Sequence, residues 1–228
     1  MEEGLYDHEV DLRQVMEELL KKRKKLAPVR LEISGKPGKE AVEYLCRQLE
    51  LSNEQISECT APLDMGFIFS LRNRIEKAHP EMFFEPVSPR LPATISPNIP
   101  MIQQILRRDI MLSYPYESIR PFIRLLNEAG NDPDVISIKI TLYRVASNSK
   151  IVEALINAAE NGKEVFVLVE LRARFDEENN IEWSKRLERA GCKVMYGPEN
   201  LKVHSKLMLI TRKNGNELQH ITQIGTGN

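Results

Sequence analysis

The segment "VISIKITLYRVASNSKIVEALINAAENGKEVFVLVEL", residues 135–171, has the pattern that indicates the fold class most clearly. It holds two apolar runs, Val135–Leu142 and Glu164–Leu171, with the amphipathic segment Lys150–Asn161 between them. Gly162 follows that segment, where a helix commonly ends. A strand, a helix and a second strand in this order predict an α/β unit with two parallel strands.

The same alternation continues on both sides of this stretch. Downstream we expect a helix over Glu178–Ala190, a stop at Gly191 and a strand over Lys193–Tyr196. Upstream we expect helices over Pro100–Arg108 and Ser118–Ala129. Strands that alternate with helices predict an α/β domain with a largely parallel sheet.

The first part of the chain has a different pattern. Two helices and a short strand are expected there: a helix over Asp11–Leu26, a strand over Val29–Ile33 and a helix over Lys39–Leu49. Five of the 13 prolines then lie between Phe84 and Pro100, a density that excludes regular helix and sheet pairing. We therefore expect an α+β head segment (1–85), a connector (86–100) and an α/β domain (101–228).

Composition limits the classes of ligand. With 32 Lys and Arg against 33 Asp and Glu, the net charge is -1, which argues against nucleic acid as a partner. An anionic ligand then needs a few placed cations. The three cysteines have no metal-ligand spacing, the acidic N-terminus is unlike a signal peptide, and no apolar run approaches the ~18 residues of a membrane span. These features predict a soluble, cytoplasmic protein.

The last 29 residues set the direction of two further strands. Only six residues separate Tyr196 from the apolar run Val203–Ile210, too few for a parallel crossover, so that run should be antiparallel. Asn214-Gly215 predicts a hairpin turn. The return strand, Leu218–Ile224, would bring the final residues back to the edge where Val203–Ile210 begins, so the sheet is expected to be mixed.

Polar residues should converge at that edge. Arg144 follows the first parallel strand and Arg174 the second, and ligands in open α/β sheets bind beyond these strand ends. His204 and Lys206 would share one strand face at the beginning of the antiparallel run. The final turn brings backbone donors from Gly225, Thr226, Gly227 and Asn228. One imidazole, an ammonium, two guanidiniums and a glycine-rich turn favour a phosphate site.

Each feature taken alone also has an ordinary structural interpretation. His204 could be a structural histidine, and the two arginines could pair with Asp176, Glu177 or Glu178 on the surface. The sequence GTGN is a common turn, and a histidine and a lysine two residues apart occur by chance in many proteins. Only the combination favours phosphate.

These residues also match a known family. The segments "TLYR", "ELRARFDEEN" and "HSK" followed by "IGTGN" closely resemble polyphosphate kinase of the bacterial ATP-using type, over roughly Phe83–Asn228. The first part resembles that family's head or middle domain. The second resembles its first C-terminal catalytic domain, which implies a phospholipase D-like α/β fold. The chain then lacks the family's N-terminal and second catalytic domains.

The resemblance implies reversible transfer of the ATP γ-phosphate to inorganic polyphosphate, with Mg²⁺ and with ADP as the other product. His204 falls on the family's phosphorylated histidine, and Lys206 is expected to assist it. Arg144 and Arg174 fall on positions that the family associates with magnesium and phosphate. A guanidinium cannot ligate a cation, so we interpret both arginines as clamps on phosphate beside a phosphate-bound Mg²⁺.

Two positions bear on this match, one in its favour and one as a departure from it. Phospholipase D-like hydrolases carry an aspartate seven residues after the motif histidine, where this chain has Thr211, which favours a kinase over a phosphodiesterase. Many family members have a histidine directly before IGTGN, where this chain has Gln223, and His220 is not its equivalent.

Two alternatives to a polyphosphate kinase stay open: a phospholipase D-like phosphodiesterase, and a non-catalytic phosphate-binding or assembly module in which Asp11–Leu49 packs against a partner subunit. For the full-length enzyme we expect a homo-oligomer, with peripheral membrane association left open.

Overall fold

A computed structural model of the chain describes residues 10–146, 148–171, 173, 176–197 and 201–226. The chain divides into two compact units, one comprising Met1–Leu19 with Ser88–Asn228 and the other comprising Leu20–Val87. The domain division into 1–85, 86–100 and 101–228 stays a prediction.

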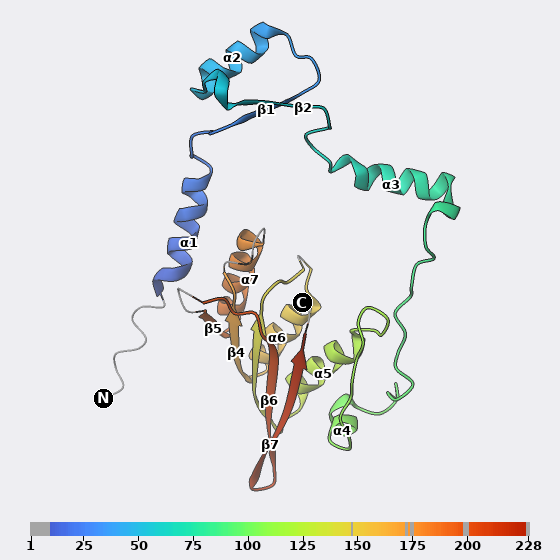
Figure 1. The fold of residues 1–228 in the computed structure, drawn as a ribbon. Helices are drawn as coiled ribbons and strands as arrows, with labels where there is room; N and C mark the ends of the chain where they lie inside the picture. Colours follow the sequence, from blue (N-terminus) through green and yellow to red (C-terminus); the bar gives the residue numbers. More distant parts are fainter. Residues whose placement is uncertain (1–9, 147, 172, 174–175, 198–200, 227–228) are drawn as a thin grey trace. The chain divides into compact units, whose positions relative to one another are not determined.

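The larger unit contains a five-stranded mixed sheet (Figure 1). Its strands are β3 (Val135–Leu142), β4 (Glu164–Val169), β5 (Lys193–Tyr196), β6 (Lys206–Asn214) and β7 (Glu217–Gly225). Their order is β5-β4-β3-β6-β7, with β3, β4 and β5 parallel, β6 antiparallel to β3, and β7 antiparallel to β6. The α/β class and the mixed sheet are confirmed. β3 and β5 have the expected bounds, whereas β4 ends two residues early.

Apolar side chains of the sheet and its helices form the core of this unit. The helices are α4 (Met101–Ile105), α5 (Arg120–Asn131), α6 (Lys150–Glu160) and α7 (Glu177–Arg189). Alternate residues of the central strands, such as Ile138, Val167 and Ile210, are fully buried, as is Leu155 of α6. The helix expected over Pro100–Arg108 is shorter, because residues 106–108 form a hydrogen-bonded turn.

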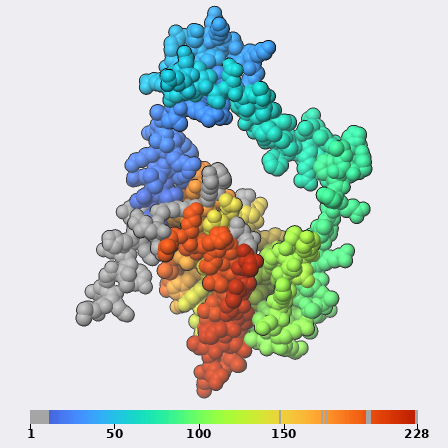
Figure 2. Space-filling model, viewed as in Figure 1, coloured from blue at the N-terminus to red at the C-terminus, as the bar shows by residue number. Residues whose placement is uncertain are grey.

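The opposite face of the sheet is open. Met195, Leu207 and Ile224 point there and are 41%, 42% and 76% exposed. Figure 2 shows the β6–β7 hairpin, in red, on the surface of this unit. Within the described part of the larger unit, helices therefore bury one face of the sheet, and side chains on the other face stay partly exposed.

The smaller unit contains a two-stranded parallel sheet of β1 (Leu31–Ser34) and β2 (Ile56–Cys59). Its helices are α2 (Lys39–Leu49) and α3 (Phe67–Ala78), with 3-10 turns at Asn53–Gln55 and Pro80–Met82. The bounds of α2 are those expected. β2 was not expected, and α3 is a 12-residue helix without buried residues.

Helix α1 (Val10–Arg23) begins in the larger unit and ends three residues earlier than expected. Arg13 pairs with Glu188, and Glu17 pairs with Lys185 at 3.0 Å, so two ion pairs join α1 to α7. Within the described residues, no helix combines the length and the apolarity needed to cross a bilayer.

Truncation of Leu155 should destabilise the larger unit. Its side chain is 0% exposed, so Leu155→Ala leaves a cavity and should lower the free energy of unfolding by about 2–5 kcal/mol. Leu218→Ala is a matched control, because Leu218 is 60% exposed and its loss should cost under about 0.5 kcal/mol. Chemical denaturation followed by circular dichroism measures both, and equal costs would contradict this assignment of the core.

Candidate functional site

The site lies at the edge of the sheet where β3 ends and β6 begins. Lys206, the first residue of β6, is paired with Gly225, the last residue of β7. Because β6 is antiparallel to β3, Lys206 and Gly225 lie near Tyr143 and Arg144, which follow β3. The strand directions expected from the loop lengths are therefore the observed ones. Thr226 is exposed directly after β7, whereas Arg174, Gly227 and Asn228 lie outside the described residues.

One expectation about this edge is wrong. β6 begins at Lys206, so His204 and Ser205 precede the strand and do not follow its alternation. The side chain of Thr141 explains the late start. Its Oγ1 donates a hydrogen bond to the Ser205 carbonyl (2.7 Å) and accepts one from the Leu207 N–H (2.9 Å), in place of ladder bonds. His204 is exposed on this approach to the strand.

The ring of Tyr143 is in contact with the side chains of His204, Lys206 and Arg144. It meets the His204 imidazole edge to face, with ring centroids 4.9 Å apart and planes at 73°. The Lys206 ammonium lies 4.8 Å from the same ring centroid, and the Arg144 guanidinium carbon lies 5.7 Å from it. Lys206 Nζ also donates to the His204 carbonyl at 2.6 Å. Tyr143 was not predicted as a site residue, although its position directly after the end of β3 is the kind of position from which Arg144 was predicted.

Two buried polar side chains hold the backbone beneath the site. Glu170 is 3% exposed, and its Oε2 accepts a hydrogen bond from the Val203 N–H at 2.7 Å. Asn180 is 1% exposed and donates to the carbonyls of Tyr143 (2.8 Å) and Glu170 (2.9 Å). These bonds tie the ends of β3 and β4 to the segment that carries His204. Neither residue was singled out from the sequence.

The close approach of Gly197 to Val203 contributes to the same support. A Cβ atom at Gly197 would lie 2.6 Å from Val203 Cγ2, so a larger residue there would push away the segment that leads to His204. The glycine thus allows the two chain segments on either side of residues 198–200 to pack closely.

Arg144 forms an ion pair with Asp176, one of the three surface partners considered in the sequence analysis. Its Nε lies 2.9 Å from Asp176 Oδ2, and the side chains are 41% and 35% exposed. Such a half-exposed pair contributes only about 0–1 kcal/mol. A phosphate with two or more negative charges could therefore compete with Asp176 for the guanidinium.

Thr211 and His220 lie away from this edge. They pair across β6 and β7, with Thr211 Oγ1 and His220 Nδ1 3.3 Å apart. Thr211 is five residues from Lys206, or roughly 17 Å along an extended strand. Gln223 is closer, because its Nε2 would lie 3.0 Å from a Cβ at Gly225. His220 is therefore not placed to act with His204.

Two other chemistries fit the site poorly. Cys192 directly precedes β5, at the edge of the sheet opposite to the site, and burial raises the pKa of its thiol to about 11, so it is not available as a nucleophile at the site. Across the ranges that the structure describes, no group of three or more His, Cys, Asp and Glu side chains could hold a metal ion. The cations near His204 do not fit a protein-held Mg²⁺.

Comparison with known proteins assigns the family. The model of polyphosphate kinase C-terminal domain 1 matches residues 100–228, and that of the polyphosphate kinase middle domain matches residues 3–71. The chain belongs to the polyphosphate kinase family. The first match covers the whole five-stranded sheet and all the candidate site residues.

Individual family members agree with this assignment. Polyphosphate kinase of Staphylococcus epidermidis is 44% identical over 96% of this chain and 30% of its own length, and that of Pseudomonas aeruginosa is 40% identical over 88% and 29%. The crystal structure of polyphosphate kinase from Porphyromonas gingivalis matches with a TM-score of 0.70 and 33% identity, over 89% of this chain and 31% of that one. The chain spans about 30% of the length of the curated relatives it matches.

Replacement of Tyr143 should release the His204 ring. An aromatic pair contributes about 0.5–1.5 kcal/mol and an exposed cation–π contact about 0.5–1 kcal/mol, so Tyr143→Ala should free both neighbours while Tyr143→Phe keeps the ring. In NMR spectra of the histidine ring protons, we expect His204 signals to move in Tyr143→Ala and to stay near the native positions in Tyr143→Phe. His220 is the internal control. Unchanged His204 signals in Tyr143→Ala would contradict the contact.

Proposed function

We propose that this chain carries the phosphoryl-accepting part of an ATP-dependent polyphosphate kinase. The observation that carries the proposal is the exposed imidazole of His204 on the Tyr143 ring, with the Lys206 ammonium over the same ring. Membership of the polyphosphate kinase family supports ATP and polyphosphate as the substrates.

In the first step, the unprotonated nitrogen of a neutral His204 ring attacks the γ-phosphorus of ATP. A P–N bond forms, the bond to the bridging oxygen breaks, and ADP leaves with that electron pair. In the second step, a terminal oxygen of polyphosphate attacks the same phosphorus. The P–N bond breaks, the imidazole regains its electron pair, and the chain is one phosphate longer. The reverse sequence forms ATP.

The cations at the edge stabilise the charge on the transferring group. Phosphoryl transfer spreads negative charge over the peripheral oxygens, so catalysis depends on placed positive groups more than on covalent help from the protein. Lys206 supplies a point charge beside His204, and Arg144 supplies a planar fork that suits phosphate. We propose that Gly225 and Thr226, with Arg174, Gly227 and Asn228, complete the phosphate contacts.

We propose that any Mg²⁺ at this site would be held by phosphate oxygens and not by Arg144 or Arg174. The family resemblance predicts magnesium near Arg144 and Arg174, but a guanidinium has no lone pair to give. Any role of these arginines toward the metal would therefore be exerted through phosphate.

Phosphoryl incorporation tests the nucleophile. Incubation with γ-labelled ATP and Mg²⁺ should give an acid-labile, alkali-stable adduct on a peptide that contains His204. His204→Ala should abolish the label, whereas the matched control His220→Ala should retain it, because His220 is an exposed histidine away from the edge.

If the chain alone takes no label, the equivalent histidine is tested in the longer Staphylococcus epidermidis enzyme. A label there would mean that His204 needs further polypeptide to react. No label on that histidine in either protein would contradict the proposed mechanism.

Removal of either cation should slow the transfer. Arg144→Ala and Lys206→Ala should each lower the rate of labelling by about 10²–10³-fold while the circular dichroism spectrum stays native. Arg144→Lys should recover only part of the rate, since it keeps the positive charge but loses the planar guanidinium that can form two hydrogen bonds to phosphate. Arg107→Ala is the matched control, an exposed arginine on the turn after α4. A native rate of labelling in Arg144→Ala would contradict the proposal that Arg144 binds the transferring phosphate.

A further inference from the structure

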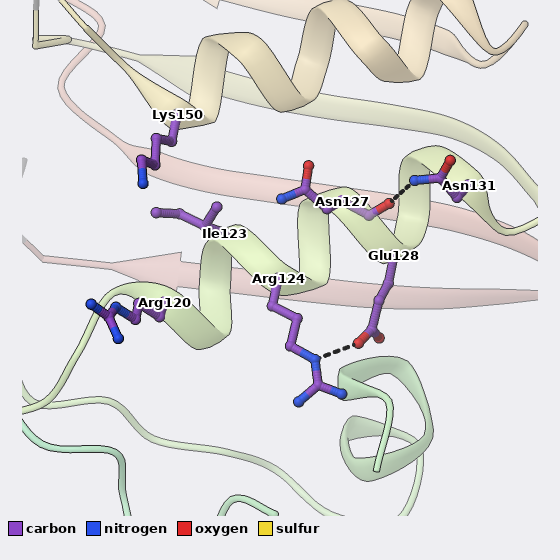
Figure 3. Close-up of a pocket in the computed structure, with 7 residues that line it drawn as sticks. All are labelled: Arg120, Ile123, Arg124, Asn127, Glu128, Asn131 and Lys150. Atoms are coloured by element: carbon purple, nitrogen blue, oxygen red, sulfur yellow. Dashed lines mark hydrogen bonds and ion pairs between the residues drawn. The ribbon is translucent and has the colours of Figure 1, made fainter. Parts of the chain in front are cut away.

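A hollow that contains none of the residues around His204 lies along α5 (Arg120–Asn131) and is also lined by Lys150, the first residue of α6 (Figure 3). Its volume is about 590 Å³, and Arg120 and Lys150 are among the residues that line it. The two helices run in parallel, because Asn161, directly after α6, donates through Nδ2 to the Gly130 carbonyl near the end of α5 at 3.2 Å. Their first residues, Arg120 and Lys150, therefore adjoin.

The hollow carries an excess of positive charge. The donors of the Arg124 side chain already have partners. Its Nε bonds Glu128 at 2.8 Å, and its two Nη atoms donate to the carbonyls of Pro97 and Ile99, each at 2.8 Å. Arg120 and Lys150 are exposed and, within the described part of the chain, form no side-chain hydrogen bond or ion pair. Figure 3 shows their charged ends on either side of Ile123. Two uncompensated cations thus face one hollow.

Helix stability does not explain the two cations. Each is the first residue of its helix, where the helix dipole disfavours positive charge by roughly 0.3–1 kcal/mol. A bound anion would reverse that effect, and a guanidinium and an ammonium that line the same hollow can each bind a different phosphate group of one chain. Asn127, an exposed residue of the same hollow, can add an amide donor.

We propose that this hollow is a second phosphate-binding site, which takes a stretch of linear polyphosphate at a distance from the reacting end. The choice of polyphosphate rests on the proposed function, whereas the anion site rests on the hollow and its cations. α5 precedes β3 and α6 follows it, so both helices begin toward the sheet edge where Tyr143 and Arg144 lie. A chain held at the hollow would keep its free end near His204 and raise the local concentration of that end.

Protection of Lys150 from acylation tests the site directly. Inorganic triphosphate should slow the reaction of Lys150 with an amine reagent, measured by peptide mass spectrometry, relative to sodium chloride of equal ionic strength. Lys213, exposed near the far end of β6, should react at one rate in both conditions. Arg120→Gln should lose the protection, whereas Arg107→Gln should keep it.

His204→Ala should also keep the protection, so failure of the phosphohistidine mechanism does not affect this test. Equal reaction of Lys150 with and without triphosphate would overturn the second site, even if His204 is labelled by ATP.

Chain length tests the proposed occupant. Arg120→Gln combined with Lys150→Gln should weaken binding of long linear polyphosphate by about tenfold or more and leave triphosphate binding at the His204 edge unchanged. Arg107→Gln combined with Lys213→Gln removes the same charge elsewhere and should have little effect. Equal weakening by the two double variants would mean that general charge, and not the hollow, holds the chain.

Discussion

The contact of Thr141 with the beginning of β6 is the constraint on which the candidate site depends. One hydroxyl bonds both the Ser205 carbonyl and the Leu207 N–H, and so holds the chain that enters β6 against the chain that leaves β3. His204 comes from the entering segment and Tyr143 from the leaving one. Without this contact, the two rings would be held near each other only by the pairing of β3 with β6 further along and by the buried hydrogen bonds of Glu170 and Asn180.

Much of the larger unit could be predicted from the sequence, because backbone geometry imposes a period on apolar residues. β3 and β5 have the expected bounds, and the direction of β6 followed from the shortness of the loop before it. The hairpin was expected at Asn214-Gly215 and is present, with a positive φ of 63° at Gly215. These features are local in the chain or follow from chain length.

The support of the site could not be predicted in the same way, since contacts between distant residues have no period. Asn180 is a polar residue in a charged helix, and nothing adjacent in sequence indicates that it is buried and bonds two strand ends. The sequence pattern placed His204 on the strand because apolar residues continue back to Val203. In the structure the strand begins later, because the Thr141 side chain on β3 takes the place of ladder hydrogen bonds at Ser205 and Leu207. The ion pair of Arg144 with Asp176 was foreseen only as one alternative among several.

The length of the turn at the tip of the β6–β7 hairpin determines which residues pair at the opposite end of the two strands. Nine consecutive pairs lead from Asn214 and Glu217 at the turn to Lys206 and Gly225 at the site, without an interruption in register. One residue added to the two-residue turn would shift β7 by one position and exchange its faces, so Gly225 would no longer lie opposite Lys206. Exposed turns usually tolerate changes of length. Here the sequence of the turn is free to vary within its backbone geometry, but its length is fixed by a site roughly 26 Å away.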